Sequence, residues 1–427
     1  MALKYKLQSI ATGNLFEDKG WTLDPNNEKK PSLIRAIYDK KQIEFGDISE
    51  GVYRFIDWLP IHRKLKGSYA PITYKSEKLA AKLGLSNLYI TFSGYWPEKG
   101  IKMNTCSFKE TESYSVGARL ATDEKRILTV ASAGNTARAF AKVCSDNNIP
   151  LLLCVPEDNL NALWFDKPLN DCVKLIVSET GGDYFDAINL SNIACELDEF
   201  LIEGGAKNVA RRDGMGTTVL SAVSHIGSIP DYYFQAVGSG TGAIAAWEAN
   251  LRLLEDGRFG NNKMKLMVSQ NIPFHPIHDA WKADSREILD MDDVSARKQV
   301  EEIIAKVLSN RKPPYPIIGG LYDAMKENGG DVLLVDNTKL KEASKLFNEL
   351  EGIDIHPASA VAVGSLIQAI ENNTVEKDAI IMLNITGGGE ERFKLDNELF
   401  YLKPLKSFPI NPSKELVFKE VRKLFNI

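Results

Sequence analysis

Three short glycine-rich segments follow apolar stretches of this chain, and each has the composition of a loop at a strand end. They are SAGNT at 132–136, GSGTG at 238–242 and TGGG at 386–389. If the preceding stretches are strands of a parallel sheet, these loops lie at the carboxyl ends of the strands, where ligands bind. The first two loops also precede helical patterns, and a helix N-terminus favours a negative charge. The pattern indicates a small ligand with anionic groups.

GSGTG is the clearest anion site. Small residues allow successive backbone N–H groups to converge on a phosphate. The segment is not a P-loop, because the Lys-Ser/Thr ending is missing. It is not a dinucleotide fingerprint either, because Ile244 and Ala245 follow Gly242. We interpret it as a phosphate cradle; the alternative is a tight turn that needs glycine only for its dihedral angles.

SAGNT combines side-chain and backbone hydrogen-bonding groups at the start of a predicted helix. It offers hydroxyl groups at Ser132 and Thr136 and an amide at Asn135. Such a set can bind a carboxylate without an arginine. The alternative is an ordinary N-cap, in which a hydroxyl group only satisfies the first helical turn.

Lys109 lies in TCSFKETES (105–113), after small and apolar residues. Taken alone, a lysine followed by Glu110 is typical of a solvated helix surface. Its position ahead of the two anion-binding loops is what favours a chemical role. HPIH (275–278) invites a metal-site interpretation, but it offers only two ligands on a proline-containing segment, so no metal is expected.

Apolar strand patterns alternate with helical patterns from about residue 86 onward. Strands are predicted at 87–94, 126–132, 151–156, 174–179, 232–237 and 379–385, and helices at 136–148, 186–201, 243–257 and 338–352. Continuous apolar strands separated by helices predict an α/β fold with largely parallel sheets covered on both faces.

The bulk composition excludes several classes of protein. The formal net charge of -5 argues against nucleic acid or an anionic membrane as a partner. The five cysteines form no Cys-x-x-Cys pair, which predicts free thiols in a reducing compartment. The N-terminal residues have no apolar signal-peptide core, and no run is long enough to span a membrane. A cytoplasmic location is expected.

Four segments occur in an order that resembles the pyridoxal-phosphate (PLP) dependent β-replacement enzymes of fold type II. They are SFKE (107–110), SAGNT, GSGTG and NITGGG (384–389). That group includes threonine synthase, cysteine synthase and serine dehydratase, and the resemblance covers about residues 68–395. It implies PLP as cofactor and a fold like the tryptophan synthase β chain. In that fold two open, twisted, mostly parallel α/β sheets have the active site between them.

The resemblance also implies a role for each motif. Lys109 would form the Schiff base with PLP and act as the catalytic residue, and Thr386 would face the pyridine nitrogen. The other implied cofactor-binding residues are Asn135, at the ring oxygen, and Gly238, Ser239, Gly240, Thr241 and Gly242, at the phosphate. The implied substrate-carboxylate site consists of Ser132, Ala133, Gly134 and Thr136. GIDIHPASAVAV (352–363) is similar to a further segment of the group, with His356 where glutamate is usual.

A division of the chain follows from the same resemblance. Residues 1–60 are expected to be an extension packed on the body, and 118–215 a small mobile domain that carries SAGNT. Residues 61–117 and 216–427 are expected to form the large PLP-binding domain. A homo-oligomer, most simply a dimer, is typical of the group.

Within the group the sequence resembles the cysteate synthases over 58–67, 72–100 and TCSFKETES. This similarity implies conversion of O-phospho-L-serine and sulfite to L-cysteate and phosphate through an aminoacrylate intermediate. The cysteate could serve coenzyme M or sulfonolipid synthesis. One departure is that no cysteine precedes Cys106, whereas related synthases often begin with paired cysteines that suggest a metal site.

Three alternatives remain open at this point. The first is threonine synthase, which acts on O-phosphohomoserine. The second is a sulfhydrylase that uses O-phosphoserine or O-acetylserine with sulfide. The third is a different class, a non-catalytic regulatory module that binds a nucleotide.

Overall fold

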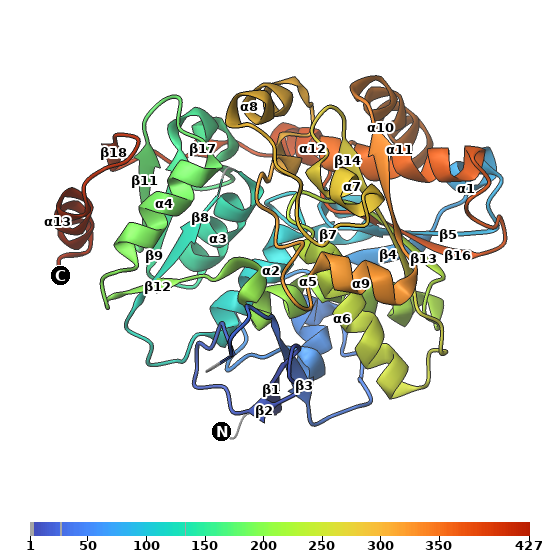
Figure 1. Ribbon diagram of the computed structural model, residues 1–427, viewed down its shortest axis with the longest axis horizontal. Helices are drawn as coiled ribbons and strands as arrows, with labels where there is room; N and C mark the ends of the chain where they lie inside the picture. The colour runs from blue at the N-terminus through green and yellow to red at the C-terminus, as the bar shows by residue number, and fades with distance from the viewer. Residues whose placement is uncertain (1–3, 26–27, 133) are drawn as a thin grey trace.

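Two separate parallel sheets form the frame of the molecule (Figure 1). The computed structural model describes residues 4–25, 28–132 and 134–427. One sheet has the strand order β15-β14-β13-β16-β5-β4, and the other has the order β12-β8-β9-β11-β18. All neighbouring pairs in both sheets are parallel except β4 with β5. This architecture confirms the predicted fold class.

The bounds of these strands agree with most of the predicted ones. In the six-stranded sheet they are β4 Ile72–Lys75, β5 Asn87–Phe92, β13 Tyr232–Ala236, β14 Lys265–Asn271, β15 Asp331–Val335 and β16 Ile380–Ile385. In the five-stranded sheet they are β8 Ile127–Ala131, β9 Leu151–Pro156, β11 Val173–Ser178, β12 Phe200–Ile202 and β18 Lys406–Phe408. No strand was predicted at β4, β14 or β15.

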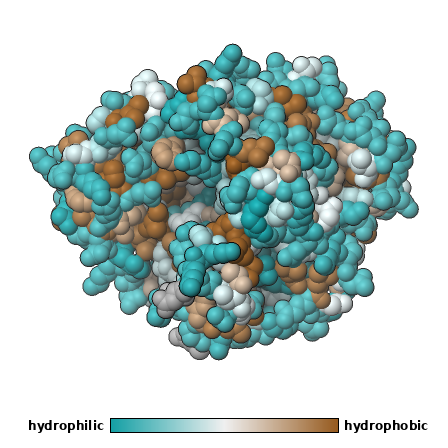
Figure 2. Space-filling model, viewed as in Figure 1, coloured by the Kyte–Doolittle hydropathy of each residue, from teal (hydrophilic) through white to brown (hydrophobic). Residues whose placement is uncertain are grey.

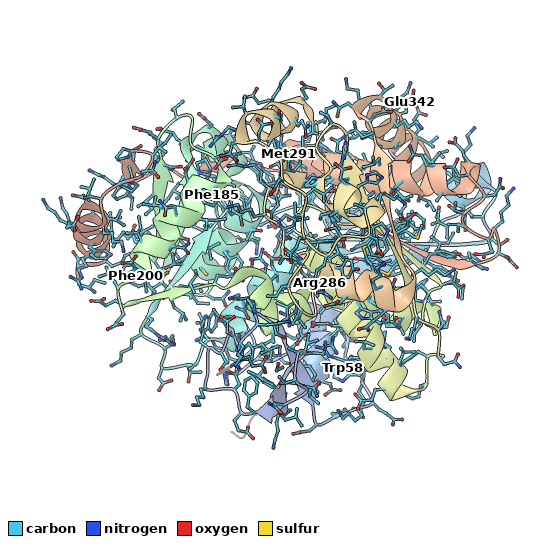
Figure 3. All side chains as sticks on the ribbon, viewed as in Figure 1. Trp58, Phe185, Phe200, Arg286, Met291 and Glu342 are labelled. Atoms are coloured by element: carbon cyan, nitrogen blue, oxygen red, sulfur yellow. The ribbon has the colours of Figure 1, made fainter. Side chains whose placement is uncertain are left out.

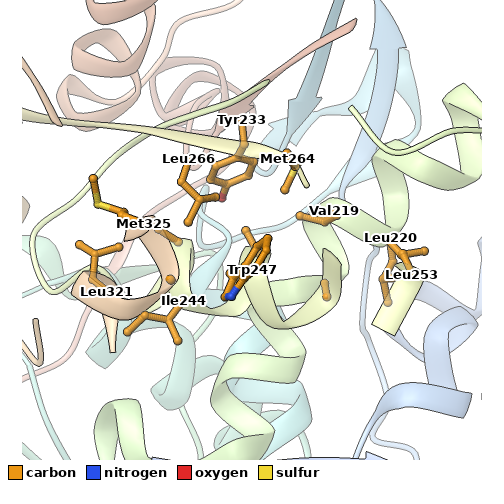
Figure 4. Packing of buried hydrophobic residues seen from close by; sticks show 14 of the residues in the cluster. Val219, Leu220, Tyr233, Ile244, Trp247, Leu253, Met264, Leu266, Leu321 and Met325 are labelled. Atoms are coloured by element: carbon orange, nitrogen blue, oxygen red, sulfur yellow. The ribbon is translucent and has the colours of Figure 1, made fainter. Parts of the chain in front are cut away.

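Helices cover both faces of the six-stranded sheet. They are α1 Lys78–Leu83, α5 Val209–Ile226, α6 Thr241–Asp256, α7 Pro276–Lys282, α9 Leu321–Asn328, α10 Asn337–Glu351 and α11 Pro357–Glu371. Successive strand residues point to opposite faces. Tyr233 therefore packs in one buried cluster with Trp247 of α6 (Figure 4), and Phe234 packs in another with Val361 of α11.

The five-stranded sheet is covered in the same way. Its helices are α3 Asn135–Asp146, α4 Tyr184–Ala194 and the C-terminal α13 Lys414–Phe425. Leu153 of β9 packs with Phe140 of α3 on one face, while Leu152 packs with Leu190 of α4 on the other. The helix α2 Lys109–Arg119 packs against α3 and also against α5, so it connects the two halves of the molecule.

The N-terminal residues form a small antiparallel sheet that packs on the larger half. Its strands are β1 Tyr5–Ser9, β2 Leu15–Phe16 and β3 Ile34–Tyr38, followed by the 3-10 segment η1 Ile48–Trp58. The Tyr38 hydroxyl donates to Asp213 of α5 at 2.6 Å. Arg119 of α2, fully buried, donates to Asp18 at 2.8 Å. The extension is therefore fixed to the body by buried polar contacts.

Two segments differ from the sequence-based prediction. The predicted helix 186–201 is wrong beyond Ala194, because Phe200–Ile202 form strand β12 beside β8. Residues 216–427 were all assigned to the large domain, whereas β18 pairs with β11 and α13 packs against α4. The chain thus returns to the five-stranded sheet at its C-terminal end (Figure 1).

In the parts of the chain that the structure describes, none of the helices combines the length and apolar character of a membrane span.

Candidate active site

The loops that follow β13 and β16 meet at Phe108, the residue before Lys109. The backbone N–H of Phe108 donates to the carbonyl oxygen of Thr386 at 2.9 Å. A Cβ atom on Gly242 would lie 3.2 Å from the Phe108 ring. β13 and β16 are neighbouring parallel strands, so their carboxyl ends share one edge of the sheet. The structure therefore brings Lys109, GSGTG and Thr386 together from three distant parts of the sequence.

GSGTG forms the turn between β13 and α6, with Gly240 at the N-cap. Among the described residues, none accepts a hydrogen bond from the backbone N–H of Gly238, Ser239 or Gly240. The hydroxyl groups of Ser239 and Thr241 lie 2.9 Å apart at the same turn. Unpaired donors before a long helix fit a bound phosphate. The glycines also serve the turn, since a Cβ on Gly242 would lie 2.7 Å from Gln235.

Lys109 is the first residue of α2, and its side chain is 19% exposed. Its Nζ lies 3.2 Å from Oε2 of Glu112 and 4.7 Å from the centre of the Phe108 ring. Burial lowers the pKa of Lys109, and the charge of Glu112 opposes this effect. A lowered pKa enlarges the fraction of neutral amine, which is the nucleophilic form. Lys109 is thus not a solvated surface lysine.

SAGNT connects β8 to α3 in the other half of the molecule. The Ser132 hydroxyl accepts from the backbone N–H of Gly134 at 3.2 Å, and Thr136 is buried. Oδ1 of Asn135 accepts from Arg138 at 2.8 Å. Ala133, also predicted for the carboxylate site, lies outside the described residues.

Arg138 connects the SAGNT helix to the Lys109 segment, and the sequence analysis did not find it. Its guanidinium is buried and donates to the carbonyl oxygens of Thr105, at 3.0 Å, and of Ala162, at 2.8 Å. It also stacks on Trp164, with 3.9 Å to the ring centre. A buried arginine with all these partners is a fixed connector. SAGNT is therefore positioned close to the lysine segment.

TGGG is supported from behind by the start of α11. The Ser359 hydroxyl donates to the carbonyl oxygen of Gly387 at 2.9 Å and lies 3.5 Å from Oγ1 of Thr386. The backbone N–H of His356 donates to the same carbonyl group at 3.0 Å. Nε2 of His356 lies 2.9 Å from Glu390. At the position where glutamate is usual in the group, this chain therefore has an imidazole paired with a carboxylate from the next helix, α12 Glu390–Asp396.

A row of alternating charges begins at Lys109. Glu112, with no exposed surface, lies 3.1 Å from Arg211 of α5, and Arg211 lies 2.5 Å from Glu203. The spacing of Lys109 and Glu112, three residues apart on a helix, was the only signal of this row in the sequence. Arg211 and Glu203 come from distant elements, so no local pattern connects them to the site.

Ion pairs connect the two halves across the recessed face seen in Figure 2. Asp183, the N-cap of α4, lies 2.7 Å from Arg311 and 3.4 Å from Arg297 of α8 Asp293–Glu302. Nζ of Lys312 lies 5.3 Å from the ring centre of Phe185, which is labelled in Figure 3. The segment that contains Arg311 and Lys312 thus contacts the opposite half.

His275 and His278 both lie beside the carboxylate of Asp279, at 2.9 and 3.1 Å. These hydrogen bonds account for one ring nitrogen of each imidazole within the α7 segment.

Comparison with known proteins shows the family of the chain. A family model described as "Pyridoxal-phosphate dependent enzyme" matches residues 75–387. Cysteate synthase of Methanosarcina mazei is 50% identical over 374 residues, which are 87% of this chain and 90% of that protein. Cysteate synthase of Methanosarcina barkeri is 47% identical over 402 residues, which are 94% and 96% of the two chains.

Solved structures share the fold at low sequence identity. Maize serine racemase matches with a TM-score of 0.57 and 16% identity over 75% of this chain and 89% of that chain. The processed form of threonine deaminase isoform 2 from Solanum lycopersicum matches with a TM-score of 0.52 and 18% identity over 77% and 86%. The family match confirms PLP as the predicted cofactor. The chain belongs to the PLP-dependent enzymes and, within them, to the cysteate synthase family.

Proposed function

We propose that the protein converts O-phospho-L-serine and sulfite to L-cysteate and phosphate. The observation that carries this proposal is identity of 45–50% to proteins named cysteate synthase, over most of each chain. The residues matched by the family model, 75–387, include Lys109, SAGNT, GSGTG and Thr386. No comparable observation favours threonine synthase or a sulfhydrylase.

We assign the cofactor to the edge of the six-stranded sheet. The unpaired backbone N–H groups of GSGTG would bind its phosphate, and Lys109 would reach its aldehyde carbon. Thr386 would face the ring nitrogen, and Asn135 the ring oxygen. These groups fit PLP. GSGTG can bind the phosphate and approaches the Phe108 ring at Gly242, and the next residue, Lys109, is a buried lysine whose pKa is lowered.

The reaction follows from what these groups do to a bound amino acid. The chemistry that PLP would supply there is stabilisation of the electron pair of the Cα–H bond, which would allow phosphate to leave Cβ. The Lys109 amine would accept the Cα proton, and burial, which lowers the pKa of Lys109, favours the neutral form that can do so. The hydroxyl groups of Ser132 and Thr136, with the backbone at Gly134, orient the substrate carboxylate. A neutral Thr386 hydroxyl supplies no charge to keep the ring nitrogen protonated, which favours prompt departure of phosphate.

We further propose that the half carrying SAGNT closes on the substrate. SAGNT and Asp183 both belong to the five-stranded half, and Asp183 pairs with arginines of the other half. Closure would exclude water from the reactive intermediate before sulfite adds.

The experiment that tests the function is product analysis by mass spectrometry. The purified protein is incubated with phosphoserine and sulfite, and cysteate and phosphate are measured. Parallel samples contain O-phosphohomoserine, or sulfide in place of sulfite. Cysteate at far higher rates than threonine or cysteine is expected; threonine or cysteine as the main product would contradict the proposal. A colourless protein that binds adenine nucleotides would instead favour a regulatory module.

We also propose a cytoplasmic location and a homodimer. The free cysteines, of which Cys106, Cys144 and Cys154 are buried, support a reducing compartment. The molar mass of the protein, measured by light scattering as it elutes from a size-exclusion column, tests the dimer. Whether the cysteate serves coenzyme M or sulfonolipid synthesis depends on which enzymes in the cell consume it.

A further inference from the structure

Four side chains of alternating charge form a row that begins at Lys109 and ends at Glu203. Lys109 Nζ lies 3.2 Å from Oε2 of Glu112, and Arg211 lies 3.1 Å from the other carboxylate oxygen, Oε1. Arg211 then contacts Glu203 at 2.5 Å. The side chains of Glu112, Glu203 and Arg211 are 0%, 7% and 13% exposed. The row therefore lies almost entirely out of water.

The charges of this row balance only when Lys109 is protonated. Two cations and two carboxylates then face one another, which is how buried charges are tolerated. When the Lys109 nitrogen is neutral, Glu112, Arg211 and Glu203 carry a net negative charge in a buried place. That surplus attracts a proton to Lys109, whereas burial of Lys109 acts in the opposite direction.

Charged and titratable groups face Lys109 from several elements. Glu112 is on α2 itself, Arg211 is in the first turn of α5, and Glu203 follows β12. Tyr184, at the start of α4, faces the same cluster from the five-stranded half. Among these groups and the rest of the described residues, Lys109 and Arg211 are the only cations within 4.0 Å of the Glu112 carboxylate. Its two oxygens are thus divided between the reactive lysine and a fixed arginine.

We propose that Glu112 is a positioning residue for Lys109, receiving the ammonium group each time the amine has taken a proton from the substrate. Arg211, fixed on its other side by Glu203, orients the carboxylate. The lysine is thereby returned to one place between turnovers. The proposal rests on the proposed function, which makes Lys109 the group that takes the proton and phosphoserine the amino acid that supplies it.

A purely structural role is the alternative for this ion pair. Pairs three residues apart on a helix stabilise it by about 0.2–0.5 kcal/mol when exposed. A helix-stabilising pair would also raise the pKa of Lys109, so labelling of the lysine tests whether the pair exists. Its loss would leave the rate of proton removal from a bound amino acid unchanged, and that rate in the PLP-loaded protein separates the two roles.

The chain offers a matched control in Glu110. It is also on α2 and fully buried, but its carboxylate accepts from Thr105 at 2.8 Å and lies 3.7 Å from Lys142. Glu110→Gln therefore removes a buried carboxylate from the same helix turn without touching Lys109. Glu112→Gln and Glu110→Gln differ in which lysine loses its partner.

The first experiment uses the cofactor-free protein, acetic anhydride and peptide mass spectrometry. Removing the Glu112 carboxylate lowers the pKa of Lys109, so labelling of Lys109 at about pH 8 is expected to rise about threefold to tenfold in Glu112→Gln. Glu110→Gln is expected to label Lys109 like the unmodified protein, and Glu112→Asp to lie between. An unchanged labelling profile in Glu112→Gln, or an equal change in Glu110→Gln, overturns the proposal. If Glu112→Gln fails to fold, Glu203→Gln decides: a smaller rise supports the proposal, and none overturns it.

The second experiment uses the PLP-loaded protein. Glu112→Gln is expected to lower the rate of Cα proton removal, measured as loss of deuterium from Cα-deuterated phosphoserine, by about tenfold or more. The KM for phosphoserine should stay within about twofold, because Glu112 does not contact the carboxylate loop. If Glu112→Gln removes the Cα proton as fast as the unmodified protein does, the proposal is also overturned. The labelling result does not depend on sulfite, so failure to form cysteate would contradict the proposed function and leave the role of Glu112 intact.

Discussion

The backbone N–H of Phe108 donates a hydrogen bond of 2.9 Å to the carbonyl oxygen of Thr386. Ser107 and Gly387 also form an isolated antiparallel bridge. These contacts fix the start of α2 against the edge of the six-stranded sheet. Lys109, the next residue, therefore begins its helix at the edge of the sheet where GSGTG and TGGG both approach Phe108.

Gly242→Ala is expected to disturb this arrangement. The new Cβ would lie 2.7 Å from Gln235 and 3.2 Å from the Phe108 ring, and both are buried. Overpacking of this kind costs about 1–3 kcal/mol, and a displaced Phe108 would also weaken PLP binding. Urea unfolding and a PLP titration followed by fluorescence measure the two effects.

Gly257→Ala, at the other end of α6, is the matched control. Gly257 has a φ of 77° and open space around its Cα, so alanine meets only backbone strain there. A loss of about 1 kcal/mol with unchanged PLP affinity is expected. Equal PLP affinities in the two variants would show that Gly242 serves the turn alone.

Glu390→Gln is expected to make the free energy of unfolding depend less on pH in the acid range. Burial alone would raise the pKa of Glu390, but the hydrogen bond and charge of His356, with Arg138 and Lys394, lower it well below its usual value of 4.5. A carboxylate with a lowered pKa stabilises the fold above about pH 4.5, and this contribution is lost as the pH falls through the folded-state pKa.

At pH 7 the variant should therefore be less stable than the unmodified protein by about 2 kcal/mol. The difference should shrink below about pH 4. Urea unfolding across this range measures it. A constant difference at every pH would contradict the assigned ion pairs.

Asp183→Asn is expected to separate two roles of this residue, the N-cap of α4 and the ion pairs between the two halves. An asparagine oxygen can still accept from the backbone N–H of Phe185, now at 2.8 Å from the carboxylate, so α4 keeps its N-cap. The ion pairs to Arg311 and Arg297 lose their charge. Stability should change by less than about 1 kcal/mol, because these pairs are partly exposed.

If closure needs these pairs, the KM for phosphoserine should rise about threefold to tenfold. Small-angle scattering should also show less compaction on substrate binding. An unchanged KM together with full compaction would remove Asp183 from the closing motion.

Much of the architecture could be predicted because apolar runs and glycines mark the elements that form the site. β8, β13 and β16 begin and end within two residues of the prediction, since each is a continuous apolar run followed by a glycine-rich loop. β12 was missed because the charges before it continue the helical spacing of α4. β18 was missed because three residues give no periodic signal, and its partner β11 is more than 200 residues away.

The charged parts of the site were harder to predict for a different reason. The loops and Lys109 were found because their types and order resemble a known group. Arg138, Arg211 and Glu203 were not, because a charged residue on a helix is usually solvated. Only tertiary packing buries them, and the sequence has no local pattern for contacts between α2, α3 and α5.

The most direct test of the whole account is to find which lysine bears the cofactor. The PLP-loaded protein is reduced with borohydride, digested and analysed by peptide mass spectrometry. The phosphopyridoxyl mass should appear on the peptide that contains Lys109, and Lys109→Ala should abolish both this mass and the visible absorption band. Attachment at another lysine in the unmodified protein would contradict the placement of the active site between the two sheets.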